Sequence, residues 1–235
     1  MKRTTIQVGS FEVNCTILSE NGQAWIVDPG NEGERILALL ARENLTPAAI
    51  LLTHAHFDHI GAIPALQAAF PDLPVYANEP DHAMFGHPMN QLPPDYPPVA
   101  KPKGLRGLRG LEGLEGLGSL EGLGGLEGLG GLEGLGGLGG LGGLEGLEVI
   151  ETPGHTPGGV CFLFRFSQPS SPLLLSGDTL FAGSVGRTDL PGGDMATLMD
   201  SLKKLTALPD DTLVIPGHGP FTSIAAEKRG NPFLQ

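Results

Sequence analysis

The chain has 235 residues, of which 40% are hydrophobic and 17% are charged, and this composition is typical of a folded protein with a buried core. Its formal net charge of -12 at pH 7 disfavours binding to the phosphate backbone of nucleic acids. No segment approaches the ~18 apolar residues of a membrane span, and no apolar stretch follows Lys2 and Arg3 as in a secretory signal, so we expect a cytoplasmic protein.

Strands and helices alternate in the first part of the chain. Short β-prone runs between Gly- and Asn-containing turns predict strands at 4–8, 13–19, 24–27, 48–53 and 75–77. Apolar residues at helical spacing predict helices at 33–44, 60–70 and near 79–86. Cys15 and Cys161 lie far apart in apolar strand-like runs. We therefore expect two buried thiols, and neither a disulfide framework nor a thiolate metal site.

Two segments of biased composition follow. Residues 88–103 contain six prolines and are expected to form a linker or a long extended loop. From Gly104 to Glu148 the chain repeats the triplet Gly-Leu-Xaa, where Xaa is Arg, Glu or Gly and Ser119 replaces one Gly. The repeat lacks the proline of collagen, and its frequent glycine disfavours an α-helix. We expect a flexible or loosely collapsed insertion first, an ordered extended coil second and a functional module last.

Regular elements return after the repeat. Apolar β-prone runs predict strands at 147–152, 159–166, within 172–181 and at 212–217. Helical spacing predicts helices at 195–208 and 223–230. This order of elements fits two mixed sheets whose outer faces are covered by helices. The predicted fold is a four-layer αββα sandwich of the α/β (α+β) class, in which 1–235 form one domain that contains the 104–148 insertion.

The stretch LTHAHFDHIG at 52–61 follows a predicted buried strand and places three histidines and one aspartate within six positions. Imidazole and carboxylate groups suit zinc, iron and manganese. His54 and His56 point the same way from an extended backbone, whereas the neighbouring side chains of Asp58 and His59 diverge. One turn can thus aim two ligands at each of two ions. Four groups do not complete two coordination shells, so further ligands are expected elsewhere.

Three further candidate ligands each follow an apolar run and stand beside a glycine that lets the backbone turn sharply. They are His155 in TPGHTPGG, Asp178 in LLLSGDTLF and His218 in LVIPGHGPF. The remaining histidines, His82 and His87, lack this framing, and we expect them at the surface. The candidate site therefore has five histidines and two aspartates.

The stretches THAHFDHIG, TPGHTPGG, SGDTLFAGSVGRTD and IPGHGPFTS, together with the ending EKRGNPFL, closely resemble the metallo-β-lactamase superfamily. Within it, the chain looks like the glyoxalase II (hydroxyacylglutathione hydrolase) group of thioesterases. The likeness covers the chain except about 88–148. It implies the superfamily's fold and a metal-dependent hydrolase of small-molecule thioesters such as S-lactoylglutathione. It also implies two divalent ions, with zinc expected first and iron or manganese as alternatives.

The resemblance implies a role for each candidate ligand. One ion would be bound by His54, His56 and His155, and the other by Asp58, His59 and His218. Asp178 would bridge the two ions together with a water or hydroxide, which the ions activate as a nucleophile at neutral pH. Asp58 would also act in catalysis by relaying a proton to the leaving group.

Two residues near these motifs have open roles. Asp28 in VDPG either orients a metal ligand or serves as a turn or cap residue. Arg187 in VGRTD either clamps a substrate carboxylate or pairs with Asp189 or another surface acid. Longer glyoxalase II enzymes carry a C-terminal helical domain that grips glutathione and has no counterpart in this sequence, so the resemblance leaves the thioester open.

Two other functions fit parts of the sequence. One is a sulfur (persulfide) dioxygenase of the same fold that uses a single iron. The presence of both Asp178 and His218 favours two metals and hydrolysis instead. The other is a non-enzymatic scaffold that works through the Gly-Leu-Xaa repeat, and the complete ligand set disfavours it. True β-lactamases generally lack the bridging aspartate, so we do not expect that activity. The sequence leaves the oligomeric state open.

Overall fold

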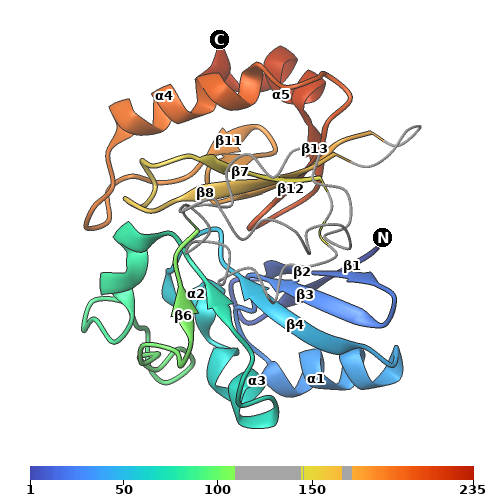
Figure 1. Cartoon of the computed structure of the whole chain (residues 1–235). Coiled ribbons are helices and arrows are strands. Elements are labelled where there is room, and N and C mark those ends of the chain that lie inside the picture. Colours follow the sequence, from blue (N-terminus) through green and yellow to red (C-terminus); the bar gives the residue numbers. More distant parts are fainter. Residues whose placement is uncertain (109–143, 145, 166–170) are drawn as a thin grey trace, which may run out of the picture.

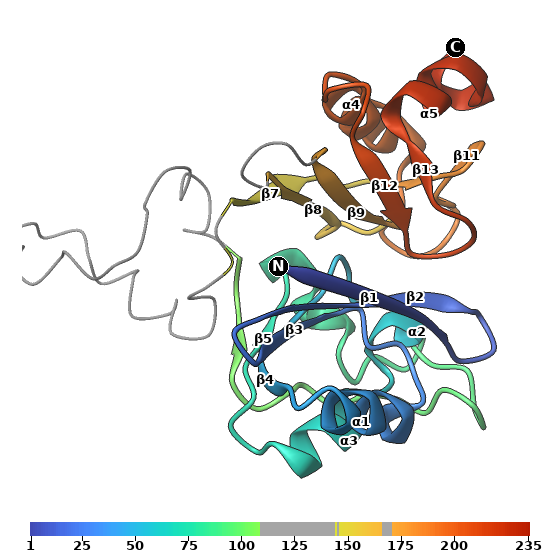
Figure 2. The same ribbon diagram turned by 90° about the vertical axis from the view of Figure 1, so that its right-hand side faces the viewer.

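The computed structural model describes residues 1–108, 144, 146–165 and 171–235. Most of the predicted triplet insertion, 109–143 and 145, lies outside the described residues. Two β-sheets face each other, and helices cover the outer face of each sheet (Figure 1). A view from the side shows the same order of layers, with the N-terminal strands in the lower sheet and the C-terminal helices above the upper one (Figure 2). The predicted four-layer αββα sandwich is confirmed.

The first sheet has six strands in sequence order. They are β1 (Lys2–Val8), β2 (Val13–Glu20), β3 (Gln23–Val27), β4 (Thr46–Leu51), β5 (Val75–Tyr76) and β6 (Leu105–Arg106). The first three are antiparallel neighbours, and β3 to β6 run parallel. Helices α1 (Gly33–Arg42) and α3 (Ile63–Ala69) cover its outer face, where Ile36, Leu40 and Leu66 are buried.

The second sheet has five strands in the order β13-β12-β9-β8-β7. In chain order they are β7 (Leu147–Glu151), β8 (Val160–Phe164), β9 (Leu173–Gly177), β12 (Leu213–Pro216) and β13 (Thr222–Ser223). Strand β12 runs parallel to β9, and the other pairs are antiparallel. Two helices cover the outer face, α4 (Met195–Thr206) and α5 (Ile224–Gly230), and the short helix η4 (Pro232–Leu234) follows them. The hairpin of β10 (Leu180–Phe181) and β11 (Ser184–Val185) is separate.

Apolar side chains fill the space between the sheets. Trp25 from the first sheet and Phe162 and Phe164 from the second belong to one buried cluster. Leu108 and Leu144, near the two ends of the triplet repeat, are 3% and 7% exposed in the same cluster. The first triplet also supplies strand β6. The repeat therefore enters and leaves the fold through the intersheet core, because its end leucines pack there.

Residues 88–103 pack against the first half of the fold. They form no helix or strand, apart from an isolated bridge between Leu92 and Tyr96. Tyr96 is 1% exposed, and Val99 belongs to the apolar cluster beneath α1 and α3. The Asn90 side chain is buried and donates a hydrogen bond to Ala55 O in the loop after β4. This segment therefore forms part of the wall around that loop.

Two differences from the predicted boundaries bear on the site, and both concern the loop after β4. The strand predicted at 48–53 ends at Leu51. The helix predicted at 60–70 is divided into α2 (Phe57–Ile60) and α3. The chain turns between them at Gly61, where a Cβ would lie 2.2 Å from Gly30 O, and a proline in the first turn starts α3. The short helix predicted near 79–86 is a 3₁₀ helix, η1 (Glu79–Met84).

Two general expectations concern the cysteines and the membrane. Cys15 and Cys161 are free and buried, as predicted, and burial raises the pKa of the Cys161 thiol to about 11. Within the described residues, no helix combines the length and the hydropathy that a membrane span requires.

Candidate metal centre

All seven predicted metal ligands gather in one place, on loops and a short helix that follow strand ends. Strand β4 leads to the loop with His54 and His56 and then to α2, β7 leads to His155, β9 to Asp178 and β12 to His218. The ligand atoms form three overlapping groups, and within each group they lie within 4.8 Å of one another. Strand ends can thus bring distant parts of the sequence to one point.

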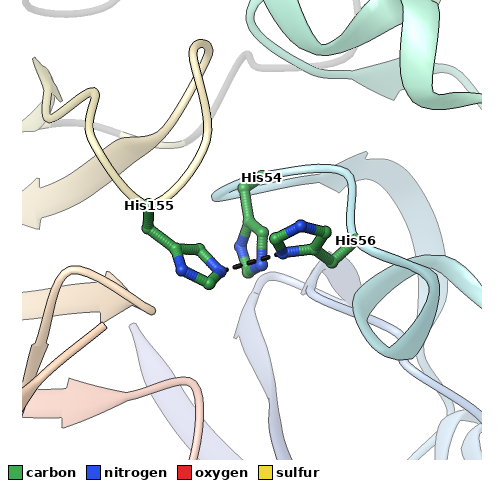
Figure 3. A group of neighbouring side chains, drawn as sticks. All are labelled: His54, His56 and His155. Carbon is green, nitrogen blue, oxygen red and sulfur yellow. Dashed lines mark hydrogen bonds between the residues drawn. The ribbon is translucent and has the colours of Figure 1, made fainter. Parts of the chain in front are cut away.

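The first ligand group consists of His54, His56 and His155, whose rings point toward one another in Figure 3. His56 Nδ1 lies 2.9 Å from His155 Nε2. Burial lowers the pKa of His54 well below its ordinary value, and burial together with His155 lowers the pKa of His56 to about 4. His54 and His56 are therefore neutral at pH 7, and their rings keep lone pairs that can bind a metal.

The second ligand group consists of Asp58, His59 and His218. His218 Nε2 lies 3.3 Å from Asp58 Oδ2 and 3.3 Å from His59 Nε2. Burial opposes the charged form of His218, but hydrogen bonds to Asp178 and Asp58 raise its pKa to about 10. Burial also opposes ionisation of Asp58, but His59 and His218 lower the pKa of that carboxyl. This group therefore holds imidazole protons that a bound cation would displace.

Asp178 lies between the two groups. Its Oδ1 is 3.4 Å from His59 Nε2, and its Oδ2 is 3.6 Å from His155 Nε2 and 3.5 Å from His218 Nε2. Burial opposes ionisation, but His59 and His218 hold the pKa of Asp178 well below its ordinary value. A charged carboxylate in this place can share its two oxygens between neighbouring cations.

Polar contacts outside the cluster hold the far sides of two ligand rings, through a close carboxylate for His59 and a hydrogen bond for His218. Asp28 is 3% exposed, and its Oδ2 lies 3.1 Å from His59 Nδ1. The same carboxylate accepts hydrogen bonds from the Thr53 N–H and hydroxyl at 2.8 and 2.7 Å. His218 Nδ1 donates to Phe11 O at 2.8 Å. Such partners fix the orientation and tautomer of a metal-binding histidine, and they leave Nε2 directed at the cluster.

Arg187 contacts the cluster through its backbone. Its carbonyl oxygen accepts a hydrogen bond from His155 Nδ1 at 2.7 Å. Its guanidinium is 61% exposed and makes two hydrogen bonds of 2.7 Å with Asp189. In this structure the Arg187 charge is therefore paired with Asp189, and its main chain holds a ligand ring.

The backbone approaches the cluster closely at Gly217. A Cβ there would lie 2.2 Å from Asp178 Oδ1 and 2.8 Å from a carbon of the His59 ring. Any side chain at this position would have to displace those ligands. The glycine of LVIPGHGPF, which the sequence suggested as a turn residue, therefore also gives the ligands room.

The donor set fits divalent metal ions. Imidazole nitrogens and carboxylate oxygens are ligands that zinc, iron and manganese share. Among the described residues, the buried atoms His54 Nε2 and Asp178 Oδ1 have no hydrogen-bond partner. Leaving such atoms unsatisfied is costly, and a bound cation would satisfy both. The cluster therefore fits a metal site.

Two buried residues that the sequence did not single out contact the backbone of the ligand loops. Asp81 in η1 accepts a hydrogen bond from Ala55 N–H, and Asn90 donates one to Ala55 O. Burial raises the pKa of the Asp81 carboxyl, and hydrogen bonds from Thr156 and Gly158 oppose that shift. Asp81 follows β5 much as the ligands follow β4, but a single acidic residue after a strand is also common in helix caps.

The sequence matches the Metallo-beta-lactamase superfamily over residues 8–218. The probable metallo-hydrolase YqgX of Bacillus subtilis is 38% identical, and the match covers 100% of this chain and 98% of that protein. Hydroxyacylglutathione hydrolase GloC of Haemophilus influenzae is 33% identical over 97% of this chain and 96% of its own length.

Solved structures share the fold, and their matches cover nearly all of the sequence. The BLEG-1 B3 metallo-beta-lactamase is 36% identical, with a TM-score of 0.76 and 100% of both chains covered. TTHA1623 in a di-iron-bound form is 35% identical, with a TM-score of 0.69 over 98% of this chain and 100% of that one. ETHE1 from Myxococcus xanthus is 26% identical, with a TM-score of 0.63 over 99% and 84%. The chain therefore belongs to the metallo-beta-lactamase superfamily of metal-binding hydrolases.

Proposed function

We propose that this chain hydrolyses thioesters and binds two divalent metal ions in the cluster. The observation that carries the proposal is the position of Asp178, whose oxygens lie within 3.6 Å of histidines from both ligand groups. A carboxylate shared in this way suits a pair of cations, whereas one cation needs no shared ligand. A related protein of 35% identity, TTHA1623, has been solved in a di-iron-bound form, which supports a two-metal site here.

In this proposal, the first ligand group would hold one ion, the second ligand group would hold the other, and Asp178 would serve both. Zinc is the ion we expect first, and iron and manganese suit the same donors. When bound, such a pair supplies a hydroxide nucleophile at neutral pH and polarises the substrate carbonyl. The chain's contribution is to orient the histidine rings through the nitrogens that face away from the cluster, as the Asp28 carboxylate does at His59 Nδ1.

Asp58 is the residue we propose to move a proton. Its side chain is 12% exposed, and its Oδ2 lies 3.3 Å from His218 Nε2, so it faces the cluster while keeping some access to substrate. A carboxylate there can take a proton from the nucleophile and return it to the leaving group. A thiol has a pKa of about 8.5, so a thiolate leaves with little help from an acid. The arrangement therefore suits thioesters better than amides.

The thioester class is supported by likeness rather than by a contact with substrate. GloC, a hydroxyacylglutathione hydrolase, is 33% identical over 97% of this chain. The sequence motifs around the ligands also resemble the glyoxalase II group. S-lactoylglutathione is therefore the first substrate to test, and Arg187 is a candidate contact for a substrate carboxylate if its pair with Asp189 opens.

A hydrolysis screen with metal content measured on the same sample tests the proposal. Protein loaded separately with zinc, iron or manganese is offered S-acylglutathiones, acyl-CoAs, lactones and nitrocefin. We expect about two ions per chain, and thioesters to be hydrolysed with the highest kcat/KM. Faster turnover of nitrocefin or a lactone than of every thioester would show that the substrate class is wrong.

The two rival functions have their own outcomes. A persulfide dioxygenase would take up oxygen with glutathione persulfide when loaded with one iron per chain, and that result would replace the hydrolase proposal. A scaffold would lack turnover altogether. A His56→Ala, Asp178→Ala double variant should lose all thioesterase activity, and full activity in that variant would contradict the site.

A further inference from the structure

A buried carboxylate outside the seven ligands joins the two loops that carry the first ligand group. Asp81 lies in η1, and its side chain is fully buried. Its Oδ2 accepts hydrogen bonds from Ala55 N–H at 3.1 Å and from the Thr156 hydroxyl at 2.8 Å. Its Oδ1 accepts one from Gly158 N–H at 2.6 Å. Ala55 stands between two ligands of the group, and Thr156 directly follows the third.

Asn90, which is 6% exposed, makes further hydrogen bonds to the loop after β4. Its Nδ2 donates to Ala55 O at 2.9 Å and to Met84 O at 3.1 Å, and its Oδ1 accepts from Phe57 N–H at 3.0 Å. Both backbone polar groups of Ala55 are therefore held by side chains, the N–H by Asp81 and the carbonyl by Asn90. Held in this way, the residue between His54 and His56 has little freedom to turn.

The contacts of Asp81 cross between the two halves of the sandwich. Residue 55 follows β4 of the first sheet, whereas residues 156 and 158 lie between β7 and β8 of the second. The first ligand group spans the same boundary, because His56 and His155 meet at 2.9 Å across it. A backbone hydrogen bond from Val160 N–H to Thr53 O at 2.8 Å crosses nearby. Asp81 joins both loops directly beside the ligands.

We propose that Asp81, assisted by Asn90, is a positioning residue that sets the spacing of the first ligand group for metal binding. The inference rests on the proposed metal-dependent function and assigns its geometry to residues that bind no metal themselves. A carboxylate suits this role because it accepts three hydrogen bonds and offers no donor when ionised. The fit is close, since a Cβ on Gly158 would lie 2.6 Å from Asp81 Oδ1.

Asp81→Asn is the sharpest perturbation, because it keeps the shape and changes one acceptor into a donor. If the amide oxygen takes the place of Oδ2, the amide NH₂ opposes Gly158 N–H. If it takes the place of Oδ1, the NH₂ opposes Ala55 N–H. In both orientations one buried N–H loses its acceptor, so one of the two loops must shift. Thr156→Val is a milder change, since it removes a single hydrogen bond and keeps the volume.

Glu227→Gln is the matched control. Glu227 is also a buried carboxylate with three donors, namely Gly183 N–H at 2.8 Å, the Thr222 hydroxyl at 2.6 Å and Asn231 Nδ2 at 2.8 Å. None of these partners carries or adjoins a ligand of the first group. The control therefore measures how much the loss of a buried carboxylate changes Tm and zinc affinity when the loops of the first ligand group keep their hydrogen bonds.

The test is a zinc titration of each metal-free variant against a chromophoric chelator, with Tm measured on the same samples. We expect Asp81→Asn to weaken one of the two zinc sites by about 10- to 100-fold, with partial rescue of occupancy at high zinc. Thr156→Val should weaken the same site less, and Glu227→Gln should leave both affinities unchanged. Asn90→Ala should also weaken that site, and it tests the idea if Asp81→Asn does not fold.

The outcomes separate the inference from the proposed function. Wild-type protein that binds no zinc, iron or manganese would refute the metal-dependent function. The positioning role alone would be refuted by a different result. In that case the wild-type protein binds zinc at two sites, and Asp81→Asn and Asn90→Ala bind zinc with the same affinities as Glu227→Gln. A loss of Tm without any change in affinity would show that Asp81 serves only stability.

Discussion

Asp28→Asn is the substitution that tests how the ligand rings are held. Asp28 has φ 51, a left-handed conformation that asparagine also tolerates, so the exchange should leave the backbone in place. The new amide oxygen can still accept from Thr53 N–H. Its NH₂ then faces His59 Nδ1, which the native Oδ2 approaches to 3.1 Å. To accept from that NH₂, Nδ1 must lose its proton, and the proton moves to Nε2.

The reversed tautomer sets the size of the effect. His59 Nε2 is the atom that lies 3.3 Å from His218 Nε2 and 3.4 Å from Asp178 Oδ1, inside the cluster. A protonated Nε2 has no lone pair for a metal. A hydrogen bond to a charged group contributes about 1.5–3 kcal/mol, and we take the 3.1 Å contact between the Asp28 carboxylate and His59 Nδ1 to be of this size. That range corresponds to about a 10- to 100-fold loss of affinity at the site that uses His59, as found for the outer partners of metal-bound histidines.

The assay is a competitive zinc titration of Asp28→Asn beside the wild-type protein. Asp72→Asn serves as the control, because it removes a carboxylate that is 96% exposed and paired only with Lys103 among the described residues. We expect Asp28→Asn to weaken one zinc site, and Asp72→Asn to leave both unchanged. Equal zinc affinities in the wild type and Asp28→Asn would refute the idea that Asp28 sets the tautomer of His59.

Three further predictions address the backbone, the protonation state and the core. Gly217→Ala should lower the zinc stoichiometry and destabilise the protein by about 1–3 kcal/mol, because the new Cβ would lie 2.2 Å from Asp178 Oδ1. A variant that binds the full amount of zinc would contradict this prediction. In metal-free protein the pKa of His218 is about 10 against 6.5 in an unfolded chain, so its contribution to stability is complete below pH 6.5 and is lost as the pH rises to 10. With a chelator present, the Tm should therefore fall between pH 6.5 and pH 10 because of His218, and it should fall more steeply than the Tm of the zinc-loaded protein. Parallel curves of Tm against pH for the two forms would argue against the raised pKa of His218. Leu108→Ala should cost about 2–5 kcal/mol in urea unfolding, because Leu108 is 3% exposed, whereas Leu92→Ala at 49% exposure should cost little.

The cluster of candidate metal ligands could be predicted because their signals are local. Each ligand follows an apolar run that forms a strand, and a glycine beside it permits a turn or a close approach. His155, Asp178 and His218 are of this kind, and the structure brings them within one cluster with LTHAHFDHIG. The layers of the fold were also predictable, since buried positions such as Ile36 and Leu40 recur at helical spacing.

The supporting residues could not be predicted, because their roles depend on contacts between distant segments. Asp81 lies 75 positions before Thr156, and nothing near it in the sequence indicates that partner. Asn90 lies in a proline-rich segment whose composition points only to an extended chain. Leu105 and Leu108 look like any other leucines of the repeat, yet one lies in β6 and the other is buried between the sheets. Tertiary packing, rather than local propensity, distinguishes them.

The measurement that tests the central claim most directly is the metal stoichiometry of Asp178→Asn, made together with its thioester hydrolysis. Asp178 is the one ligand placed between the two groups, within 3.6 Å of His59, His155 and His218. The wild-type protein should hold about two ions per chain and hydrolyse a thioester, and the variant should lose at least one ion and nearly all turnover. A variant that keeps two ions and wild-type kcat/KM would contradict a shared, bridging role for Asp178.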